Sequence, residues 1–512
     1  MVHSTLNSNV HEKASTPWAG EGSKTPPSPF VHKYRTERGF YVYDVNTNDI
    51  LKADEAEYDL VDDYGPLPRA DLIPKWRSKY TQAEIEKALD GLDLMVRKGY
   101  LSAHRPSRFV DFTEFLGVLL ESGMEQLILN TTETCNLRCR YCLYSGTYPL
   151  ERTHSAANMS LETAKRAIKY FKEHSGDKDR SHLSFYGGEP LTCFETVRGT
   201  VEYAESLGGW GDLFIHVDSN STLITDEIID FLVKHKIALQ VSLDGPKEVH
   251  DRYRVYRNGK GTYDRIIRNV NRIREADRDY YRDYVYFVAT LTPPYDLTLI
   301  DEFFAGEQFA DNTMSANFME TYDTEFFDKY SAGMENLIDE TLMRLKRDYV
   351  DARAHGRDPS KLAVALLDQA FIRLHRRKPE KLSDTIPMNG CCMPGVRRVF
   401  VTADGDLYPC EKVESKEFLI GHVDTGVDLN LVKKVVDTYA EHSIGDCADC
   451  WASRLCSMCY NSAKHGAKFD IERKRERCEK QRTTWHATLQ MYTTILEDNP
   501  RAFDFVKDLY IE

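Results

Sequence analysis

The chain has 512 residues and a formal net charge of -14 at pH 7, and its length predicts more than one domain. The negative charge argues against nucleic-acid binding because phosphates attract basic surfaces, and no apolar run approaches the roughly 20 residues that span a bilayer. The start, MVHSTLNSNVHEK, lacks the charged and then apolar pattern of a signal peptide, so we expect a cytoplasmic protein that binds neither nucleic acid nor membrane.

Residues 1–28 are predicted to be a disordered tail, because this stretch is rich in Ser, Thr, Pro and Lys and has little apolar surface to bury. Over residues 29–110, FVHKY, GFYVYDV and DILKA indicate three short strands. Helical spacing follows, with one apolar stripe made of Ile85, Leu89, Leu92 and Val96. Together these elements predict a winged-helix-like domain. A DNA-binding winged helix is the alternative, and the many Asp and Glu residues of the helices argue against it.

Strand-like and helix-like segments alternate over residues 111–330. The strand-like segments are EQLILN, SHLSFYGG, LFIHVDSN, IALQVSLDG and YVYFVATLT. Repeated strand–helix units predict a parallel sheet with right-handed crossovers, which gives an α/β fold class with a partial (β/α)6 barrel of the TIM type. Residues 331–388 are predicted to be a helical connector, 389–480 a cysteine-rich domain and 481–512 a C-terminal helix.

Three cysteines lie close together in ETCNLRCRYCLYSG, at Cys135, Cys139 and Cys142. A disulfide cannot use an odd number of thiols and a structural zinc site closes with four ligands, so the cluster predicts a metal centre that is open on one side. A zinc site completed by a distant residue is the alternative. The loop follows a predicted strand, which is where α/β barrels place their chemistry. Its Cys-x3-Cys-x2-Cys spacing resembles the cluster loop of radical S-adenosylmethionine (SAM) enzymes.

This resemblance implies that the three thiolates hold three irons of a 4Fe-4S cluster and that SAM chelates the fourth iron through its amino and carboxylate groups. In that family the reduced cluster cleaves SAM to a 5'-deoxyadenosyl radical, which abstracts hydrogen from an unactivated carbon. The cofactor carries the hard chemistry, and the protein orients and shields it. The electron would come from a reductant such as flavodoxin or ferredoxin.

A glycine-containing motif follows the second predicted strand of the barrel. In YGGEP, the two glycines would let the backbone approach a ligand, and the glutamate would accept hydrogen bonds from a cation. The segment resembles the GGEP motif that holds the amino group of SAM in radical SAM enzymes. The resemblance assigns that role to Gly187, Gly188, Glu189 and Pro190.

Three further segments are compared with SAM-contacting stretches of the same family. QVSLDGPKEVHDRYR places Ser242, Asp244 and Arg254 where they could face a ligand, and it resembles the SLDG stretch of peptide maturases and sulfatase-maturating enzymes. By that resemblance Ser242 and Arg254 would contact the SAM carboxylate or ribose. Tyr144 would lie along the adenine. Asn220 stands in DSNSTLIT, in the place of a usual TNGTLL.

Eight of the twelve cysteines fall between residues 391 and 478, which by itself is compatible with a zinc ribbon. With the upstream loop they resemble a SPASM domain, which holds two auxiliary 4Fe-4S clusters. The resemblance implies a second auxiliary cluster on Cys447, Cys450, Cys456 and Cys478. The first would use Cys410 and Cys459 with either Cys391 or Cys392. Because adjacent side chains diverge, the first cluster is predicted to have three protein ligands and an open iron.

The combined resemblances predict an oxidoreductase-type enzyme that modifies a ribosomally made precursor peptide, joining a cysteine sulfur to a carbon in a thioether. The front domain resembles the recognition element that binds a leader peptide by adding it as a strand to a sheet edge, so the partner is a leader-bearing precursor peptide. A sulfatase-maturating or carbon–carbon crosslinking enzyme is the first alternative. The second is a non-catalytic, zinc-containing scaffold that binds peptide.

Overall fold

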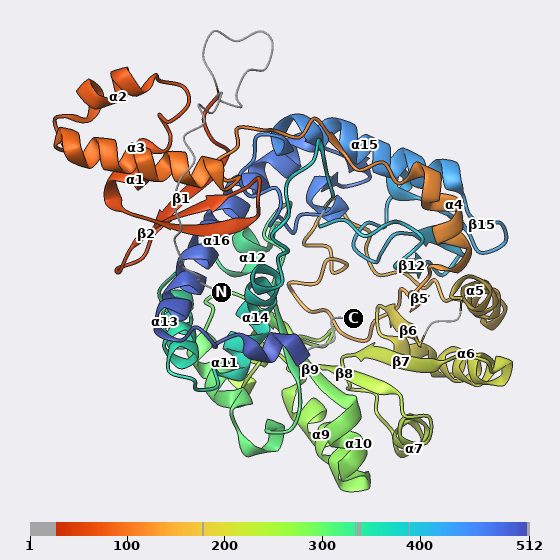
Figure 1. Ribbon diagram of the computed structural model, residues 1–512. Helices are drawn as coiled ribbons and strands as arrows, with labels where there is room; N and C mark the ends of the chain where they lie inside the picture. The colour runs from red at the N-terminus through yellow and green to blue at the C-terminus, as the bar shows by residue number, and fades with distance from the viewer. Residues whose placement is uncertain (1–26, 177–178, 333, 335–338, 389, 509–512) are drawn as a thin grey trace. The chain divides into compact units, whose positions relative to one another are not determined.

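The computed structural model describes residues 27–508, except 177–178, 333, 335–338 and 389 (Figure 1). The predicted disordered tail therefore lies almost entirely outside the described residues. The chain divides into two compact units. The first comprises the described residues up to Ser107 together with Lys378–Ile386 and Ala448–Arg454, and the second comprises the remaining segments.

The first unit contains the three strands predicted for the front of the chain. β1 (Val31–Arg35), β2 (Phe40–Asp44) and β3 (Asp49–Ala53) form an antiparallel sheet in the order β1-β2-β3. Three helices follow: α1 (Glu55–Leu60), α2 (Arg69–Trp76) and α3 (Gln82–Arg97). A capping box between Thr81 and Glu84 starts α3. Its buried stripe packs in one core with Val42 and Leu60, as the spacing predicts.

A short segment from the cysteine-rich region completes this first unit. The ring of Trp451 stacks on His32 of β1 with 3.5 Å between ring centroids. The Arg454 guanidinium donates to the carbonyl oxygens of Val45 and Asn46, each at 3.2 Å, and to that of Glu380 at 2.8 Å. The sequence pattern contained no signal for this association.

Between residues 126 and 318, the described part of the second unit contains six parallel strands, so the predicted parallel pairing is confirmed. The strands, in sheet order, are β5 (Gln126–Thr132), β6 (Arg180–Gly187), β7 (Asp212–Ser219), β8 (Ala238–Ser242), β9 (Val285–Leu291) and β10 (Met314–Phe318). The helices between them are α5 (Leu161–His174), α6 (Phe194–Leu207), α7 (Asp226–Lys234), α8 (Lys247–Tyr253), α9 (Tyr263–Ala276), α10 (Arg278–Tyr284) and α11 (Leu297–Phe304). Figure 1 shows α5, α6 and α7 along the outer side of these strands.

The same sheet continues into the cysteine-rich region. β12 (Arg398–Val401) pairs in parallel with β5, and β13 (Asp406–Tyr408), β14 (Gly421–His422) and β15 (Gly426–Val427) follow antiparallel. The sheet is therefore a mixed sheet of ten strands rather than a purely parallel one. The apolar residues of β12 are fully buried, so its pairing covers an edge of β5 that would otherwise present unpaired backbone groups.

The remaining helices of the second unit are α4 (Thr113–Ser122), α12 (Phe326–Tyr330), α13 (Asp339–Ala354), α14 (Lys361–His375), α15 (Leu429–Cys447) and α16 (Ile471–Asp498). The last helix begins ten residues before the predicted start at 481, because Asp470 caps it by accepting from the backbone N–H groups of Glu472 and Arg473. Cys478 thus lies on a helix. Among the described helices, none is both long and apolar enough to cross a membrane.

Candidate active site

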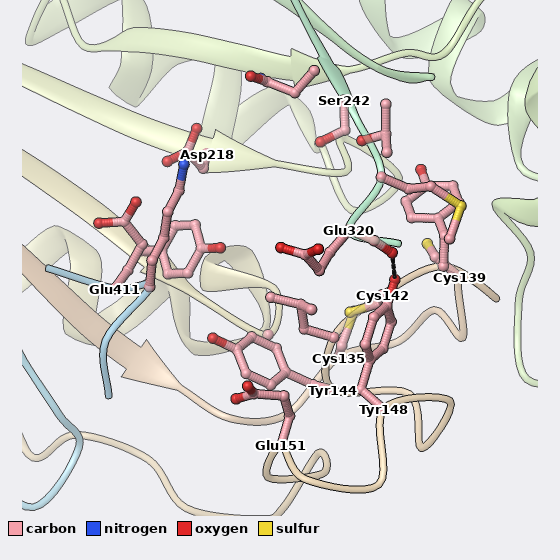
Figure 2. Close-up of a pocket in the computed structure, with 18 of the residues that line it drawn as sticks. Cys135, Cys139, Cys142, Tyr144, Tyr148, Glu151, Asp218, Ser242, Glu320 and Glu411 are labelled. Atoms are coloured by element: carbon pink, nitrogen blue, oxygen red, sulfur yellow. Dashed lines mark hydrogen bonds between the residues drawn. The ribbon is translucent and has the colours of Figure 1, made fainter. Parts of the chain in front are cut away.

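A cavity of about 580 Å³ opens at the carboxyl ends of the parallel strands (Figure 2). Its walls come from the loops after β5 and β6, from the ends of β7, β8, β9 and β10, and from residues 411–414 and 461–480. This volume lies in the range of small-molecule and cofactor sites. Of the predicted site residues, Cys135, Cys139, Cys142, Tyr144, Gly187, Gly188, Glu189, Asn220, Ser242 and Arg254 line it. Pro190 does not.

The three clustered cysteines share one wall of the cavity. Backbone hydrogen bonds from Arg138 and Arg140 to the carbonyls of Val255 and Tyr253 fix their loop against the end of α8 and the residues that follow it. Burial, followed by the charge of Glu189, raises the pKa of the Cys135 thiol to about 12. A thiol with this pKa is protonated at neutral pH, so binding iron must release its proton.

The donor set fits an iron–sulfur cluster. Three soft sulfur ligands on one wall, with polar groups around an open volume, match a cluster that keeps one position for another ligand. In the described part of the chain, no three His, Cys, Asp or Glu side chains converge on a point where a single metal ion would sit. A 4Fe-4S cluster needs a wider arrangement, because each thiolate binds a different iron.

The two glycines of the YGGEP stretch line the cavity and also allow a close contact within the chain. A Cβ at Gly187 would lie 2.2 Å from the carbonyl oxygen of Thr132, and one at Gly188 would lie 2.2 Å from that of Thr134. Gly187 also has φ of +143°, a conformation that glycine adopts without strain. Their absent side chains therefore let the end of β6 pack directly against the chain that leads into Cys135.

Glu189 is a fully buried carboxylate with three donors. Its Oε1 accepts from the Ser219 hydroxyl at 2.8 Å and the Leu191 N–H at 3.1 Å, and its Oε2 accepts from the Asn220 N–H at 2.7 Å. Burial nevertheless raises the pKa of Glu189 to about 7. A carboxylate has about four acceptor positions, so one remains for a cationic group in the cavity. The Asn220 amide also donates to the Asn136 side chain at 2.9 Å, which ties β7 to the cysteine loop.

Arg254 lines the cavity as one half of a buried ion pair. Its Nη2 lies 3.1 Å from Oδ1 of Asp244, and the same carboxylate accepts from the Tyr141 hydroxyl at 2.6 Å. Burial opposes the charge on Asp244, but Arg254 and then His250 hold the pKa of Asp244 below its usual value. Asp244 itself does not line the cavity. The expectation that it faces a ligand is corrected, because its oxygens are used to position Arg254.

The cysteines of the C-terminal region lie outside the lining of this cavity. Burial, then Cys459 and, more weakly, Cys392 raise the pKa of Cys391 well above its usual value. Burial, then Glu411 and, more weakly, Cys459 raise the pKa of Cys410. These four thiols are therefore close enough to interact. A Cβ at Gly390 would lie 2.0 Å from the carbonyl oxygen of Met458, so a glycine lets the two segments approach.

The cysteines predicted to hold the second auxiliary cluster are distributed over both units. Cys447 ends α15, and its Sγ accepts from Lys474 Nζ at 3.4 Å. Lys474 belongs to α16, the helix that carries Cys478. The carbonyl oxygen of Cys456 accepts from Arg373 at 2.9 Å. Cys450 belongs to the short segment that folds with the first unit.

Sequence reasoning missed much of the wall opposite the cysteines. Figure 2 shows Asp218 and Glu411 on that side, and Glu320 between them and the cysteine loop. Other unpredicted lining residues are Tyr148, Glu151, Arg152, Tyr186, Tyr322, Asp323, Glu414, Lys464 and Arg477. Asp218 could have been predicted, because it lies near the end of a predicted strand and is two residues after His216, so both side chains point to the same face of the sheet. The loop residues had no such signal.

Comparison with known proteins identifies the family of this site. The model of the radical SAM superfamily matches residues 129–296. A cysteine-type anaerobic sulfatase-maturating enzyme of Clostridium novyi (strain NT) is 22% identical over 346 residues, which cover 65% of this chain and 87% of that protein. Residues 129–296 thus form a radical SAM domain, a type of domain that uses a 4Fe-4S cluster and SAM, as the cysteine loop predicts.

Two solved structures resemble the fold. Native anSMEcpe with bound AdoMet has a TM-score of 0.53 and 19% sequence identity, over 75% of this chain and 100% of that chain. Native anSMEcpe with bound AdoMet and Kp18Cys peptide has a TM-score of 0.51 and 18% identity, over 75% and 99% of the two chains. At 18–19% sequence identity, these two similarities show that this chain shares the fold of those structures.

Proposed function

We propose that this chain, whose residues 129–296 form a radical SAM domain, modifies a ribosomally made precursor peptide by joining a cysteine sulfur to a carbon. The observation that carries the proposal is the convergence of Cys135, Cys139, Cys142, Glu189 and Arg254 on one cavity. When bound there, the cluster and SAM supply the carbon radical that abstracts hydrogen from the substrate.

The chain's own residues position and shield the cofactors. Cys135, Cys139 and Cys142 hold the cluster. Glu189 accepts from the SAM ammonium through its remaining acceptor position, and its three fixed donors keep it aimed into the cavity. Arg254, held by Asp244, donates to the carboxylate or ribose of SAM. Because these groups are preorganised, binding SAM requires little rearrangement.

The first unit supports a peptide substrate. Its sheet has β1 and β3 as edges. No described strand pairs with the outer side of β1 or of β3, but the ring of Trp451 already covers His32 of β1, so we place the peptide on β3. A leader peptide adds to that edge as a fourth strand, with backbone hydrogen bonds that do not depend on its side chains. A peptide also accompanies AdoMet in a solved structure that shares this fold.

The thioether assignment is supported by the C-terminal thiols. Cys391, Cys392, Cys410 and Cys459 lie close enough to perturb one another. We assign three of them to a first auxiliary cluster, which would offer an open iron to the substrate thiol, and Cys447, Cys450, Cys456 and Cys478 to a second. The thiol would lose its proton on binding, and the auxiliary clusters would take up the electron released when the sulfur joins the carbon radical. Binding to iron deprotonates a thiol and holds it in place.

A second candidate is sulfatase maturation, favoured by the similarity to the Clostridium novyi enzyme of that name. The two candidates differ in substrate, since one takes a leader-bearing peptide and the other a sulfatase. Incubating the enzyme with each substrate and measuring the mass of the product separates them.

The proposal is tested by replacing Cys135, Cys139 and Cys142 together with Ala in protein reconstituted without oxygen. The variant should contain about four irons fewer than the wild type, the content of one cluster, and should form no 5'-deoxyadenosine. Cys193→Ala is the matched control, because the Cys193 thiol contacts the Thr196 hydroxyl at 3.2 Å and does not line the cavity. Retained 5'-deoxyadenosine formation in the triple variant would falsify the assignment.

A further inference from the structure

The loop that carries Tyr144 is tied to the loop after Cys410 by a mostly buried ion pair. Nε of Arg152 lies 3.1 Å from both carboxylate oxygens of Glu414. The two side chains are 20% and 17% exposed. A second carboxylate, that of Glu133, lies 3.6 Å from the same nitrogen.

The same guanidinium lies against the aromatic ring of Tyr144, with its Cζ 3.9 Å from the ring centroid. Both terminal nitrogens of Arg152 are buried and have no hydrogen-bond partner among the described residues. The aromatic face, the Glu414 carboxylate and, at a longer distance, the Glu133 carboxylate are therefore the contacts that hold this cation. A cation placed over an aromatic ring is attracted by it, more strongly when both are shielded from water.

Tyr144 has few other means of keeping its orientation. Its side chain is buried, and its pKa is raised by burial while Arg152 opposes the rise. The His154 ring approaches its edge, with 6.2 Å between centroids. No described residue makes a hydrogen bond to the Tyr144 hydroxyl. The ring is thus oriented by packing, and Arg152 covers one of its faces.

We propose that Arg152 is a positioning residue for the nucleoside half of SAM, and that Glu414 holds it in place. The inference rests on the proposed function, in which Tyr144 lies along the adenine. The Arg152 guanidinium fixes one face of the Tyr144 ring, so that the ring presents a rigid surface to the base. Because Glu414 follows Cys410 by four residues, the conformation of the auxiliary-cluster loop controls the affinity of the enzyme for SAM.

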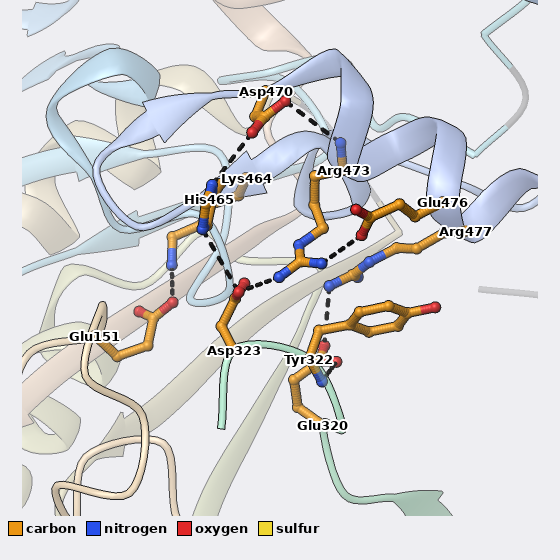
Figure 3. A network of polar contacts seen from close by, with 10 residues as sticks. All are labelled: Glu151, Glu320, Tyr322, Asp323, Lys464, His465, Asp470, Arg473, Glu476 and Arg477. Carbon is orange, nitrogen blue, oxygen red and sulfur yellow. Dashed lines mark hydrogen bonds and ion pairs between the residues drawn. The ribbon is translucent and has the colours of Figure 1, made fainter. Parts of the chain in front are cut away.

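Other ion pairs lie near the cavity without touching Tyr144, and they provide a control (Figure 3). Arg473 of α16 pairs with Asp323 and with Glu476, and Lys464 pairs with Glu151. Arg473 does not line the cavity. Removing it loosens the contact between α16 and the loop after β10 and leaves the Tyr144 ring covered.

The experiment measures binding of SAM, 5'-deoxyadenosine and methionine to anaerobically reconstituted holoenzyme by equilibrium dialysis. Arg152→Gln and Glu414→Gln should each weaken binding of SAM and of 5'-deoxyadenosine about tenfold, the effect of about 1.4 kcal/mol. Methionine, which lacks the nucleoside, should bind as it does to the wild type. The double variant should be no weaker than Arg152→Gln alone, since both changes break one connection. Arg152→Lys, which keeps a cation between ring and carboxylate, should recover part of the loss.

Two outcomes overturn the inference. If the Arg152 and Glu414 variants lose methionine affinity as much as 5'-deoxyadenosine affinity, the cavity is disrupted in general. The same conclusion follows if Arg473→Gln weakens 5'-deoxyadenosine binding as much as Arg152→Gln does. Tyr144→Leu separates this inference from the proposed function. If Tyr144→Leu leaves 5'-deoxyadenosine affinity unchanged, the placement of SAM itself is wrong. If it weakens affinity while the Arg152 and Glu414 variants do not, only the positioning role fails.

Discussion

Glu189 should make the stability of the cluster-free protein depend on pH. Its carboxyl group is 1% exposed, and burial raises its pKa from 4.5 to about 7. The folded state thus binds this proton more tightly than the unfolded state does. Protonation of Glu189 therefore stabilises the folded state fully below pH 4.5, and this stabilisation is lost as the pH rises through 7. A pKa difference of about 2.5, at 1.36 kcal/mol per unit, gives a loss of about 3 kcal/mol.

The assay compares wild type with Glu189→Gln, which cannot titrate. Urea denaturation of both cluster-free proteins, followed by tryptophan fluorescence from pH 4.5 to 8.5, gives the difference in their unfolding free energies at each pH. The variant lacks one acceptor oxygen for the donors from Ser219 and Asn220, so it should be less stable at low pH. The difference should shrink by about 3 kcal/mol as the pH rises. If the unfolding free energies of wild type and Glu189→Gln change with pH in the same way, burial does not raise the pKa of Glu189 as argued.

Three further outcomes follow from the structure. Asp244→Asn should destabilise the second unit by about 3–5 kcal/mol in urea denaturation, because it leaves the Arg254 cation buried without its partner, and a smaller cost would show that water reaches the pair. A leader peptide should slow amide hydrogen exchange in β3 but not in β1, and protection of β1 instead would place the peptide elsewhere. Of Cys391→Ala and Cys392→Ala, only one should lower the iron content, and loss of the cluster in both would contradict an open iron.

The elements that could be predicted from sequence are those with local signals. The apolar run FYVYD gave β2, whose consecutive residues are buried. The stripe through Ile85 and Leu89 gave α3, because burial of one helix face imposes a period on the sequence. The cysteine loop was recognisable because all three of its thiols lie within eight residues of one another. Asn220, although its motif departs from the usual one, does contact Glu189.

What could not be predicted depends on contacts between residues far apart in the chain. Arg152 and Glu414 form an ion pair although they are 262 residues apart in the chain, and the sequence around neither residue predicts this contact. The glycines of YGGEP line the cavity, but their motif gave no indication that they also let β6 contact the chain at 132–134. Likewise, Trp451 gave no indication that it packs on His32. Residue propensity and spacing describe one segment at a time and do not predict which distant segment it packs against.

The pairing of β12 with β5 has a consequence for synthesis on the ribosome. The hydrogen-bonding edge of β5 is complete soon after residue 132 is made, but its partner ends at residue 401. At about 5–20 residues per second, this edge waits on the order of tens of seconds for its partner. During that interval an apolar strand with unpaired backbone groups is exposed to other nascent chains. Slow translation or a shortage of chaperones should therefore lower the yield of folded protein more than the stability of the finished fold would suggest.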